Sequence, residues 1–192
     1  MSGPKVDRRT VIAGLIGFGS LTWALSPRAA HARLRPPGAA PPGRFEALCI
    51  RCYRCAEVCP VSCIQFEAGL DLRNLGTPSL APKDKGCTLC MACTEACPTG
   101  ALQPTSTDPE RIFATVKMGE PILDRRRCIS WSNQGVCRAC YYVCPYPGKA
   151  ITLGGPRQGP VFHAEACVGC ALCSEACPPE AKAIDIRPPR EG

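Results

Sequence analysis

The chain has 192 residues, a formal net charge of +7 and an aromatic fraction of 6%. Its seventeen cysteines are accompanied by only two histidines, which excludes a metal site built from several histidines. The sequence contains no Cys-x-x-Cys-His for a c-type haem and no Gly-x-Gly-x-x-Gly after a strand for a nicotinamide or flavin. With so few aromatic residues a conventional core is thin, so we expect the fold to depend on bound metal and the apoprotein to be largely unfolded.

Residues 1–32 have the three-part layout of an export signal. A basic region with Arg8 and Arg9 is followed by an apolar stretch over 11–25 and by Ala30-His31-Ala32, a small-residue cleavage site. The apolar stretch is shorter than the roughly 20 residues of a membrane span. The arginine pair predicts a twin-arginine signal, a route suited to proteins that are exported already folded with their clusters. The alternatives are an ordinary signal and an uncleaved signal that tethers the protein to the membrane.

Residues 33–48 form a Pro/Gly-rich segment that begins Arg33-Leu34-Arg35-Pro36-Pro37-Gly38-Ala39. This composition predicts an extended chain with polyproline character. Two interpretations are open. The segment is either a spacer between the signal and the folded domain or an arm that lies on a partner protein.

The remainder, 49–192, contains one cysteine pattern four times, at intervals of about 40 residues, and such a period marks internal repetition. The pattern is Cys-x2-Cys-x2-Cys-x3-Cys-Pro, except that the first gap of the third copy is stretched. The four motifs, numbered in chain order, are Cys49, Cys52, Cys55 and Cys59; Cys87, Cys90, Cys93 and Cys97; Cys128, Cys137, Cys140 and Cys144; and Cys167, Cys170, Cys173 and Cys177.

This spacing is the bacterial ligand set for [4Fe–4S] clusters, in which the fourth cysteine binds the other cluster of a pair. Disulfides would explain cysteine richness in an exported chain but not one pattern repeated four times. Structural zinc usually shows separated Cys-x2-Cys pairs. The sequence therefore predicts sixteen ligands for four [4Fe–4S] clusters. Each cluster with its thiolates adds a charge of roughly −2, so the basic composition does not indicate nucleic-acid binding.

Cys63 is the one cysteine outside the motifs. In the segments that follow each Cys-Pro, it stands where the other copies have Ala101, Ala150 and Ala183. We interpret it as a small buried apolar residue. The alternative is a ligand or a redox-active thiol.

Between the motifs the expected elements are short. We expect strands over 64–66, 121–124, 151–153, 160–163 and 184–186, helical turns over 94–97 and 174–177, a short helix within 111–117, and loops over 67–85 and 154–159. These elements predict an α+β, loop-rich fold of tandem ferredoxin-like dicluster modules, with short β-hairpins and short helices around four clusters. Trp131, in the insert of the third motif, is interpreted as a packing residue over the cluster, with a partner contact as the alternative.

Three arginines lie inside cysteine loops. Arg51 and Arg54 belong to the first motif and Arg138 belongs to the third. A nearby cation favours the more negative, reduced cluster, so these residues are expected to raise the reduction potential. The alternative is that they are loop charges that face solvent.

The chain resembles the NapG/MauM-type periplasmic ferredoxins. The resemblance rests on the Arg8-Arg9 signal, on the segment that starts at Arg33, and on the four cysteine motifs. The stretched third motif with Asn133-Gln134-Gly135, followed by Ala150-Ile151-Thr152-Leu153, is its most discriminating part.

The resemblance implies a relay at the outer face of the cytoplasmic membrane. Such a protein accepts electrons from a membrane-bound Fe–S quinol dehydrogenase subunit and passes them to a periplasmic reductase or cytochrome acceptor. The implied settings are periplasmic nitrate reduction and methylamine utilisation. No residue set resembles a catalytic acid–base pair or activated nucleophile, so the chain is expected to be a component of a respiratory chain without a catalytic site of its own.

Two competing functions are an electron-transfer Fe–S subunit of a molybdenum-type oxidoreductase complex and a maturation or sensing protein. By analogy with four-cluster subunits of larger oxidoreductases, motif one would pair with motif four and motif two with motif three. Sequential pairing, one with two and three with four, is the rival arrangement.

Overall fold

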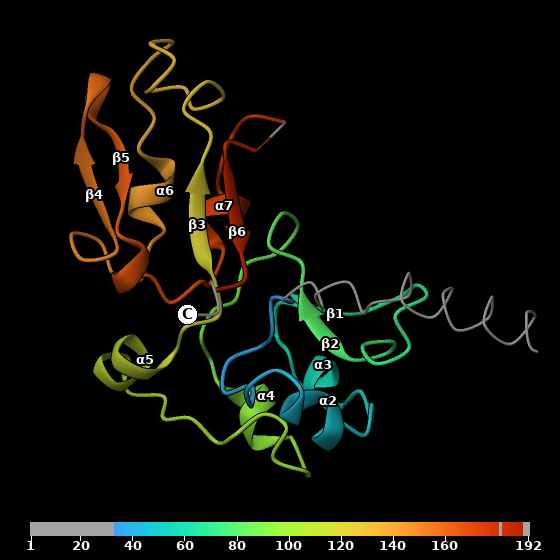
Figure 1. Ribbon diagram of the computed structural model, residues 1–192. Coiled ribbons are helices and arrows are strands. Elements are labelled where there is room, and N and C mark those ends of the chain that lie inside the picture. Colours follow the sequence, from blue (N-terminus) through green and yellow to red (C-terminus); the bar gives the residue numbers. More distant parts are fainter. Residues whose placement is uncertain (1–32, 181, 190–192) are drawn as a thin grey trace, which may run out of the picture. The chain divides into compact units, whose positions relative to one another are not determined.

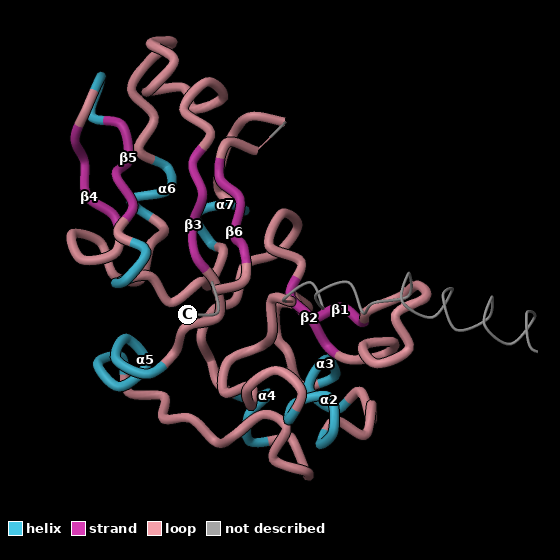
Figure 2. The backbone as a smooth tube through the Cα atoms, viewed as in Figure 1, coloured by secondary structure: helices cyan, strands magenta, loops and turns pink. Residues whose placement is uncertain are grey.

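The computed structural model describes residues 33–180 and 182–189, so the expected export signal over 1–32 lies outside the described residues. Short helices and two-stranded antiparallel sheets are joined by long loops (Figures 1 and 2). The helices are α2 (Arg44–Leu48), α3 (Arg54–Glu57), α4 (Ala92–Glu95), α5 (Pro109–Thr115), α6 (Ala139–Tyr142) and α7 (Leu172–Glu175), and 3₁₀ turns are formed by η1 (Pro156–Gln158) and η2 (Ala164–Ala166). The strands are β1 (Ile64–Phe66), β2 (Pro78–Leu80), β3 (Glu120–Leu123), β4 (Ile151–Gly154), β5 (Gly159–Phe162) and β6 (Ile184–Arg187).

The C-terminal half has the strand arrangement of a repeated unit. The strand after motif three, β4, pairs with β5, which leads into motif four. The strand before motif three, β3, pairs with β6, which follows motif four, and Figure 1 shows these two side by side. The N-terminal half repeats the first of these pairs, because β1 follows motif one and pairs with β2 before motif two.

The segment over 33–48 supplies the missing counterpart of the β3–β6 pair. Ala39 forms an isolated antiparallel bridge with Leu102, which follows motif two. The Ala40 amide donates to the Ala101 carbonyl at 2.9 Å, and the Gln103 amide donates to the Gly38 carbonyl at 2.7 Å. The segment is therefore hydrogen-bonded to its own chain, which contradicts a spacer outside the folded domain, whereas contact with a partner stays a prediction.

Arg35 anchors this segment. Its guanidinium donates to Thr77 Oγ1 and to the Pro78 carbonyl, each at 2.8 Å, and pairs with Glu46 Oε1 at 2.9 Å. It also lies over the ring of Phe45, 4.5 Å from the centroid. Burial is the largest influence on this guanidinium and lowers the pKa of Arg35, against the opposing effect of Glu46. A buried cation of this kind is tolerated because hydrogen bonds satisfy it on several sides.

The end of the segment differs from the predicted extended chain, because Arg44–Leu48 is helical. The Glu46 carboxylate accepts from the Gly43 amide at 2.5 Å, which satisfies a free amide at the helix start. A second correction concerns 67–85, predicted as loop. Residues 78–80 form β2 because they pair with β1 in the register Ile64↔Leu80.

The other expected elements are confirmed with small changes in their ends. The five predicted strands correspond to β1, β3, β4, β5 and β6. The helix expected within 111–117 is α5, which begins earlier because Asp108 Oδ1 accepts from the Arg111 amide at 2.9 Å and Pro109 occupies the first turn.

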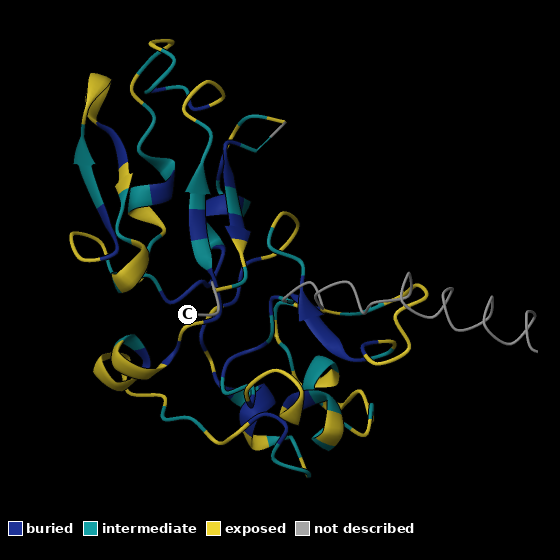
Figure 3. Cartoon of the chain, in the orientation of Figure 1, coloured by how far each residue is buried: buried dark blue, intermediate teal, exposed yellow. Residues whose placement is uncertain are grey.

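The core of the described residues is built around the cysteine motifs. Phe45, Met91, Leu102, Ile151 and Val168 are among its fully buried side chains, and eight of the seventeen cysteines are buried with them. Figure 3 colours the buried parts of the chain dark blue. The fold is α+β and loop-rich, as expected. Within the part of the chain that the structure describes, no helix is long and apolar enough to cross a membrane.

Candidate iron–sulfur cluster sites

Each cysteine loop is shaped by residues with left-handed backbone. In motifs one, two and four the residues immediately before and after the second cysteine have positive φ, and in motif three only the residue after it does. These positions are Arg51, Tyr53, Leu89, Met91, Arg138, Gly169 and Ala171. Non-glycine residues adopt this conformation at a cost of about 1–2 kcal/mol each, so it persists only where the surrounding structure requires it.

The second of these positive-φ residues also starts a helix. Tyr53, Met91, Arg138 and Ala171 are the N-caps of α3, α4, α6 and α7. Each of these helices carries the third cysteine of its motif in its first turn. The reversal at the N-cap and the following turn of helix therefore wrap the first three cysteines of a motif around one space.

Four cavities are each lined by four motif cysteines. Their empty volumes are similar, about 310 to 370 Å³, which fits one kind of cofactor in all four. The first cavity has Cys49, Cys52, Cys55 and Cys97; the second has Cys59, Cys87, Cys90 and Cys93; the third has Cys128, Cys137, Cys140 and Cys177; the fourth has Cys144, Cys167, Cys170 and Cys173.

These cavities establish sequential pairing. Motifs one and two exchange Cys59 and Cys97, and motifs three and four exchange Cys144 and Cys177. The arrangement drawn from larger oxidoreductases, one with four and two with three, is wrong for this chain. The physical reason is that α3 packs against α4 and α6 packs against α7, so each fourth cysteine ends beside the neighbouring loop.

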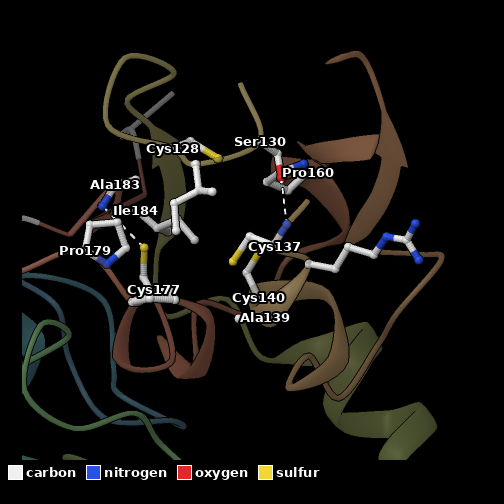
Figure 4. Close-up of a pocket in the computed structure, with 13 residues that line it drawn as sticks. Cys128, Ser130, Cys137, Ala139, Cys140, Pro160, Cys177, Pro179, Ala183 and Ile184 are labelled. Atoms are coloured by element: carbon white, nitrogen blue, oxygen red, sulfur yellow. Dashed lines mark hydrogen bonds between the residues drawn. The ribbon is translucent and has the colours of Figure 1, made fainter. Parts of the chain in front are cut away.

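The third cavity shows how the stretched motif is completed. In Figure 4 the labelled sulfurs of Cys128, Cys137, Cys140 and Cys177 face a common space. The insert loops out after Cys128 and returns, held by the fully buried Ser130, whose hydroxyl accepts from the Cys137 amide at 3.1 Å. The expectation that Cys128 completes its set despite the longer gap is confirmed.

Trp131 does not line this cavity, so its predicted place over the cluster was wrong, although it is a packing residue. Its indole Nε1 donates to the Pro160 carbonyl at 3.0 Å. A Cβ at Gly155 or Gly159 would come within 2.5 or 2.7 Å of the indole, so the ring packs on the β4–β5 hairpin where only glycine leaves room.

Backbone amides point at cysteine sulfurs in two of the four motifs, the second and the fourth. The distances from amide nitrogen to sulfur are 3.3 to 3.4 Å, and the donor and acceptor residues are Leu89 and Cys87, Leu102 and Cys97, Gly169 and Cys167, and Ala183 and Cys177. Such bonds favour the thiolate over the thiol. At Cys97 burial opposes ionisation, but the amides of Leu102 and Thr99 outweigh it and lower the pKa of this cysteine.

Burial raises the pKa of the third cysteine in several motifs. It raises the pKa of Cys55 to about 11, and the pKa values of Cys93 and Cys140 to about 12. It also raises the pKa of Cys170, the second cysteine of motif four, to about 12. Without a cofactor these side chains are thiols at neutral pH, so iron must displace their protons.

The arginines of the cysteine loops differ in position. Arg51 lines the first cavity, and its guanidinium donates to the carbonyls of Leu75 and Arg73. Arg54 is exposed and lines none of the four cavities. Arg138 lines the third cavity, and its Nε is buried with no hydrogen-bond partner among the described residues.

Cys63 is buried, as expected, but it also lines the second cavity. Its sulfur lies 3.6 Å from Cys59 Sγ. A hydrogen bond between Cys63 and Cys87, together with burial, raises the pKa of Cys63, and the same bond lowers the pKa of Cys87 to about 7. The second cavity therefore has five sulfurs where each of the others has four.

The cysteine sets fit a cluster better than a single ion. Among the described residues, no group of three or more His, Cys, Asp or Glu side chains is arranged to hold a metal ion. The four cysteines of each set instead surround a space. In a [4Fe–4S] cube each thiolate binds a different iron, so the sulfurs stand around the cube and do not converge on one point.

The two halves meet beside Cys87 and Cys170. The Cys87 amide donates to the Cys170 carbonyl at 2.7 Å, and the Gly86 amide donates to Glu175 Oε2 at 2.8 Å. Cys87 belongs to the second cavity and Cys170 to the fourth. The cavities are therefore connected in the order first, second, fourth, third, which differs from the order of the motifs in the sequence.

Three known domain families match the chain. Residues 48–101 match a 4Fe-4S dicluster domain, residues 86–147 a 4Fe-4S double cluster binding domain and residues 160–182 a 4Fe-4S binding domain. The first match spans motifs one and two, in agreement with the exchanged cysteines. The second spans motifs two and three, which the structure places in different pairs, so that match reflects ligand spacing and not a shared cavity.

Relatives cover most of the chain. It is 34% identical over 177 residues to the methylamine utilization ferredoxin-type protein MauM of Methylobacillus flagellatus, which covers 86% of this chain and 73% of the relative. It is 38% identical over 175 residues to the ferredoxin-type protein NapG of Haemophilus influenzae, which covers 82% of this chain and 60% of the relative. The NapG of Escherichia coli is 34% identical over 157 residues, which are 74% of this chain and 65% of that protein.

The cysteine sets, the matched domains and these relatives agree. The chain belongs to the MauM and NapG family of ferredoxin-type proteins, and it is an iron–sulfur electron-transfer protein with four [4Fe–4S] clusters.

Proposed function

We propose that this protein is a periplasmic relay that takes electrons from a membrane-bound Fe–S quinol dehydrogenase subunit and delivers them to a periplasmic reductase or cytochrome. The delivery route leads either to nitrate reduction or to methylamine utilisation. The name of the Methylobacillus relative, a methylamine utilization ferredoxin-type protein, favours the second route. The two NapG relatives are named only as ferredoxin-type proteins, and this chain spans less than two thirds of their length.

The observation that carries the proposal is the continuous series of cavities. A [4Fe–4S] cluster supplies a one-electron redox centre when it is bound. The sixteen motif cysteines, proposed here as the ligands, place four such centres in a row whose ends are the first and third cavities. A row with two separate ends suits a protein that receives electrons from one partner and releases them to another.

The first cavity is the more open end. None of its cysteines is buried, and Cys52 is exposed, whereas Cys128, Cys140 and Cys177 of the third cavity are all buried. Ile50 and Tyr53, on either side of Cys52, are exposed to 62% and 47%. We therefore place one of the two partner contacts at the loop of motif one.

The periplasmic location rests on the expected twin-arginine signal. Replacing Arg8 and Arg9 with lysine keeps the positive charge but removes the arginine pair. The variant is expected to remain in the cytoplasm, as judged by cell fractionation, while the unchanged protein enters the periplasm. Equal export of both forms would mean that the signal is of the ordinary kind.

The relay itself is tested by reconstitution under anaerobic conditions. Purified holoprotein is mixed with quinol, with or without cell membranes, and the visible absorbance of the clusters is followed. We expect reduction only when membranes are present, and reoxidation when the cognate nitrate-reducing or methylamine-oxidising proteins are added. Rapid reduction by quinol alone would contradict the need for a membrane partner. Obligate co-purification with a large catalytic subunit would favour a molybdenum-type complex instead.

A further inference from the structure

The second cavity contains one sulfur more than a [4Fe–4S] cluster uses. Cys63 is 2% exposed and lines this cavity together with Cys59, Cys87, Cys90 and Cys93. Its sulfur is 3.6 Å from that of Cys59, within the range of a hydrogen bond between sulfur atoms. A cysteine thiol is a weak donor, and the thiolate of a cluster ligand is an acceptor.

The same position in the other three repeats carries a methyl group. Ala101, Ala150 and Ala183 are each 2% exposed, as Cys63 is, so all four side chains occupy equivalent buried places after the Cys-Pro turn. The repeats thus provide three natural comparisons in which this place holds no donor. An alanine is tolerated there three times, so packing alone does not require sulfur at the fourth.

From this geometry we infer that Cys63 is a positioning residue of the second cluster, whose thiol donates a hydrogen bond to a ligand sulfur and raises the reduction potential of that cluster. A donor to a ligand sulfur stabilises the added negative charge of the reduced cluster more than it stabilises the oxidised one. The second cluster lies between the first and the fourth in the row. If its reduction potential is higher, an electron that passes between the two halves occupies the second cluster in preference to its neighbours.

The inference rests on the assignment of Cys59, Cys87, Cys90 and Cys93 as the ligands of this cluster. The iron and acid-labile sulfide content of the unchanged protein tests that assignment separately. Four clusters per chain are expected. The electron paramagnetic resonance signal that is lost or altered in a Cys90→Ser variant then belongs to the cluster of the second cavity.

The experiment compares Cys63→Ala and Cys63→Ser with the unchanged holoprotein in redox titrations followed by electron paramagnetic resonance. In Cys63→Ala we expect four clusters, with only the signal marked by Cys90→Ser shifted to lower potential. Loss of one hydrogen bond to a charged acceptor corresponds to about a tenfold change in the equilibrium constant for reduction, which is about 59 mV for a one-electron couple. Cys63→Ser keeps a donor and should recover part of this shift.

Two results would overturn the inference. Four unchanged midpoints in Cys63→Ala would make Cys63 a packing residue only. Loss of a cluster from that variant, measured as iron and sulfide, would make Cys63 a ligand or an essential wall of the cavity. An equal downward shift in the Ala and Ser variants would likewise remove the hydrogen bond as the cause.

Discussion

The amide of Cys87 donates to the carbonyl of Cys170 at 2.7 Å, so a cysteine that lines the second cavity is hydrogen-bonded directly to one that lines the fourth. We therefore expect electrons to pass between the halves at motifs two and four, although motif three lies between them in the sequence.

Gly86 controls how closely these halves approach. A Cβ at this position would lie 2.8 Å from both the Cα and the amide nitrogen of Leu172, so Gly86→Ala must push the backbones apart. We expect a loss of about 1–3 kcal/mol in stability. We also expect biphasic reduction in stopped-flow experiments, with two clusters reduced quickly and two slowly.

Gly154→Ala is the matched control, because its Cβ would make an ordinary contact of 3.5 Å with Val161. It should keep the reduction kinetics of the unchanged protein. If Gly86→Ala also reduces all four clusters in one phase, the passage between the halves lies elsewhere.

Arg51 and Arg54 offer a paired test of charge near the first cluster. Arg51 lines the first cavity and Arg54 does not. Replacing Arg51 with glutamine removes a cation that favours the reduced cluster, so the potential of the first cluster should fall. Arg54→Gln should leave it nearly unchanged because solvent screens an exposed charge. Redox titration of the two variants checks this, and equal shifts would refute a role specific to Arg51.

Arg35 is expected to hold the segment over 33–48 in place on the N-terminal half. Arg35→Met removes the donors to Thr77 and Pro78 and leaves the partly buried Glu46 without its cation. Breaking such a pair from one side costs about 3–5 kcal/mol in stability.

Arg33→Met is the control. It removes the more exposed pairing with Asp71 and Glu67 and should cost about 1 kcal/mol or less. Denaturant titration of cluster absorbance without oxygen compares them, and similar losses would argue against the anchoring role.

Iron retention should depend on pH through the buried cysteines. Burial raises the pKa of Cys55 to about 11 and the pKa values of Cys93, Cys140 and Cys170 to about 12, so these groups carry protons at neutral pH and release them on ligation. Affinity for iron should therefore increase as pH rises from about 6.5 to about 8.5, by up to about tenfold per pH unit for each proton released. Competition with a chelator measures this, and a flat profile would contradict it.

The sequence was sufficient for the cysteine motifs and most short elements, because both are local patterns. Cys-x2-Cys-x2-Cys and a following apolar triplet such as Ile64-Gln65-Phe66 can be recognised within a few positions. Even the stretched third motif was recognised from its last three cysteines, and the structure brings Cys128 back to them.

The features that were missed depend on contacts between distant residues. Spacing within a motif does not say which other motif receives the fourth cysteine, so the place of Cys97 required the packing of α3 on α4. The strand-like role of Ala39 depends on Leu102, far along the chain. The left-handed residues were missed because Arg51, Tyr53 and Leu89 are not glycines and carry no local signal of positive φ.

Sequential exchange of the fourth cysteines has a consequence for biosynthesis. A nascent chain that has left the ribosome as far as Leu102 already holds every thiol of the first two cavities, as well as the Ala39 bridge that closes this half. The first pair of cubes can therefore be built while the rest of the polypeptide is still being translated. If the first motif were paired with the last, the cysteine set of the first cavity would be incomplete until synthesis had ended. Its thiols would be exposed to oxidation during that time.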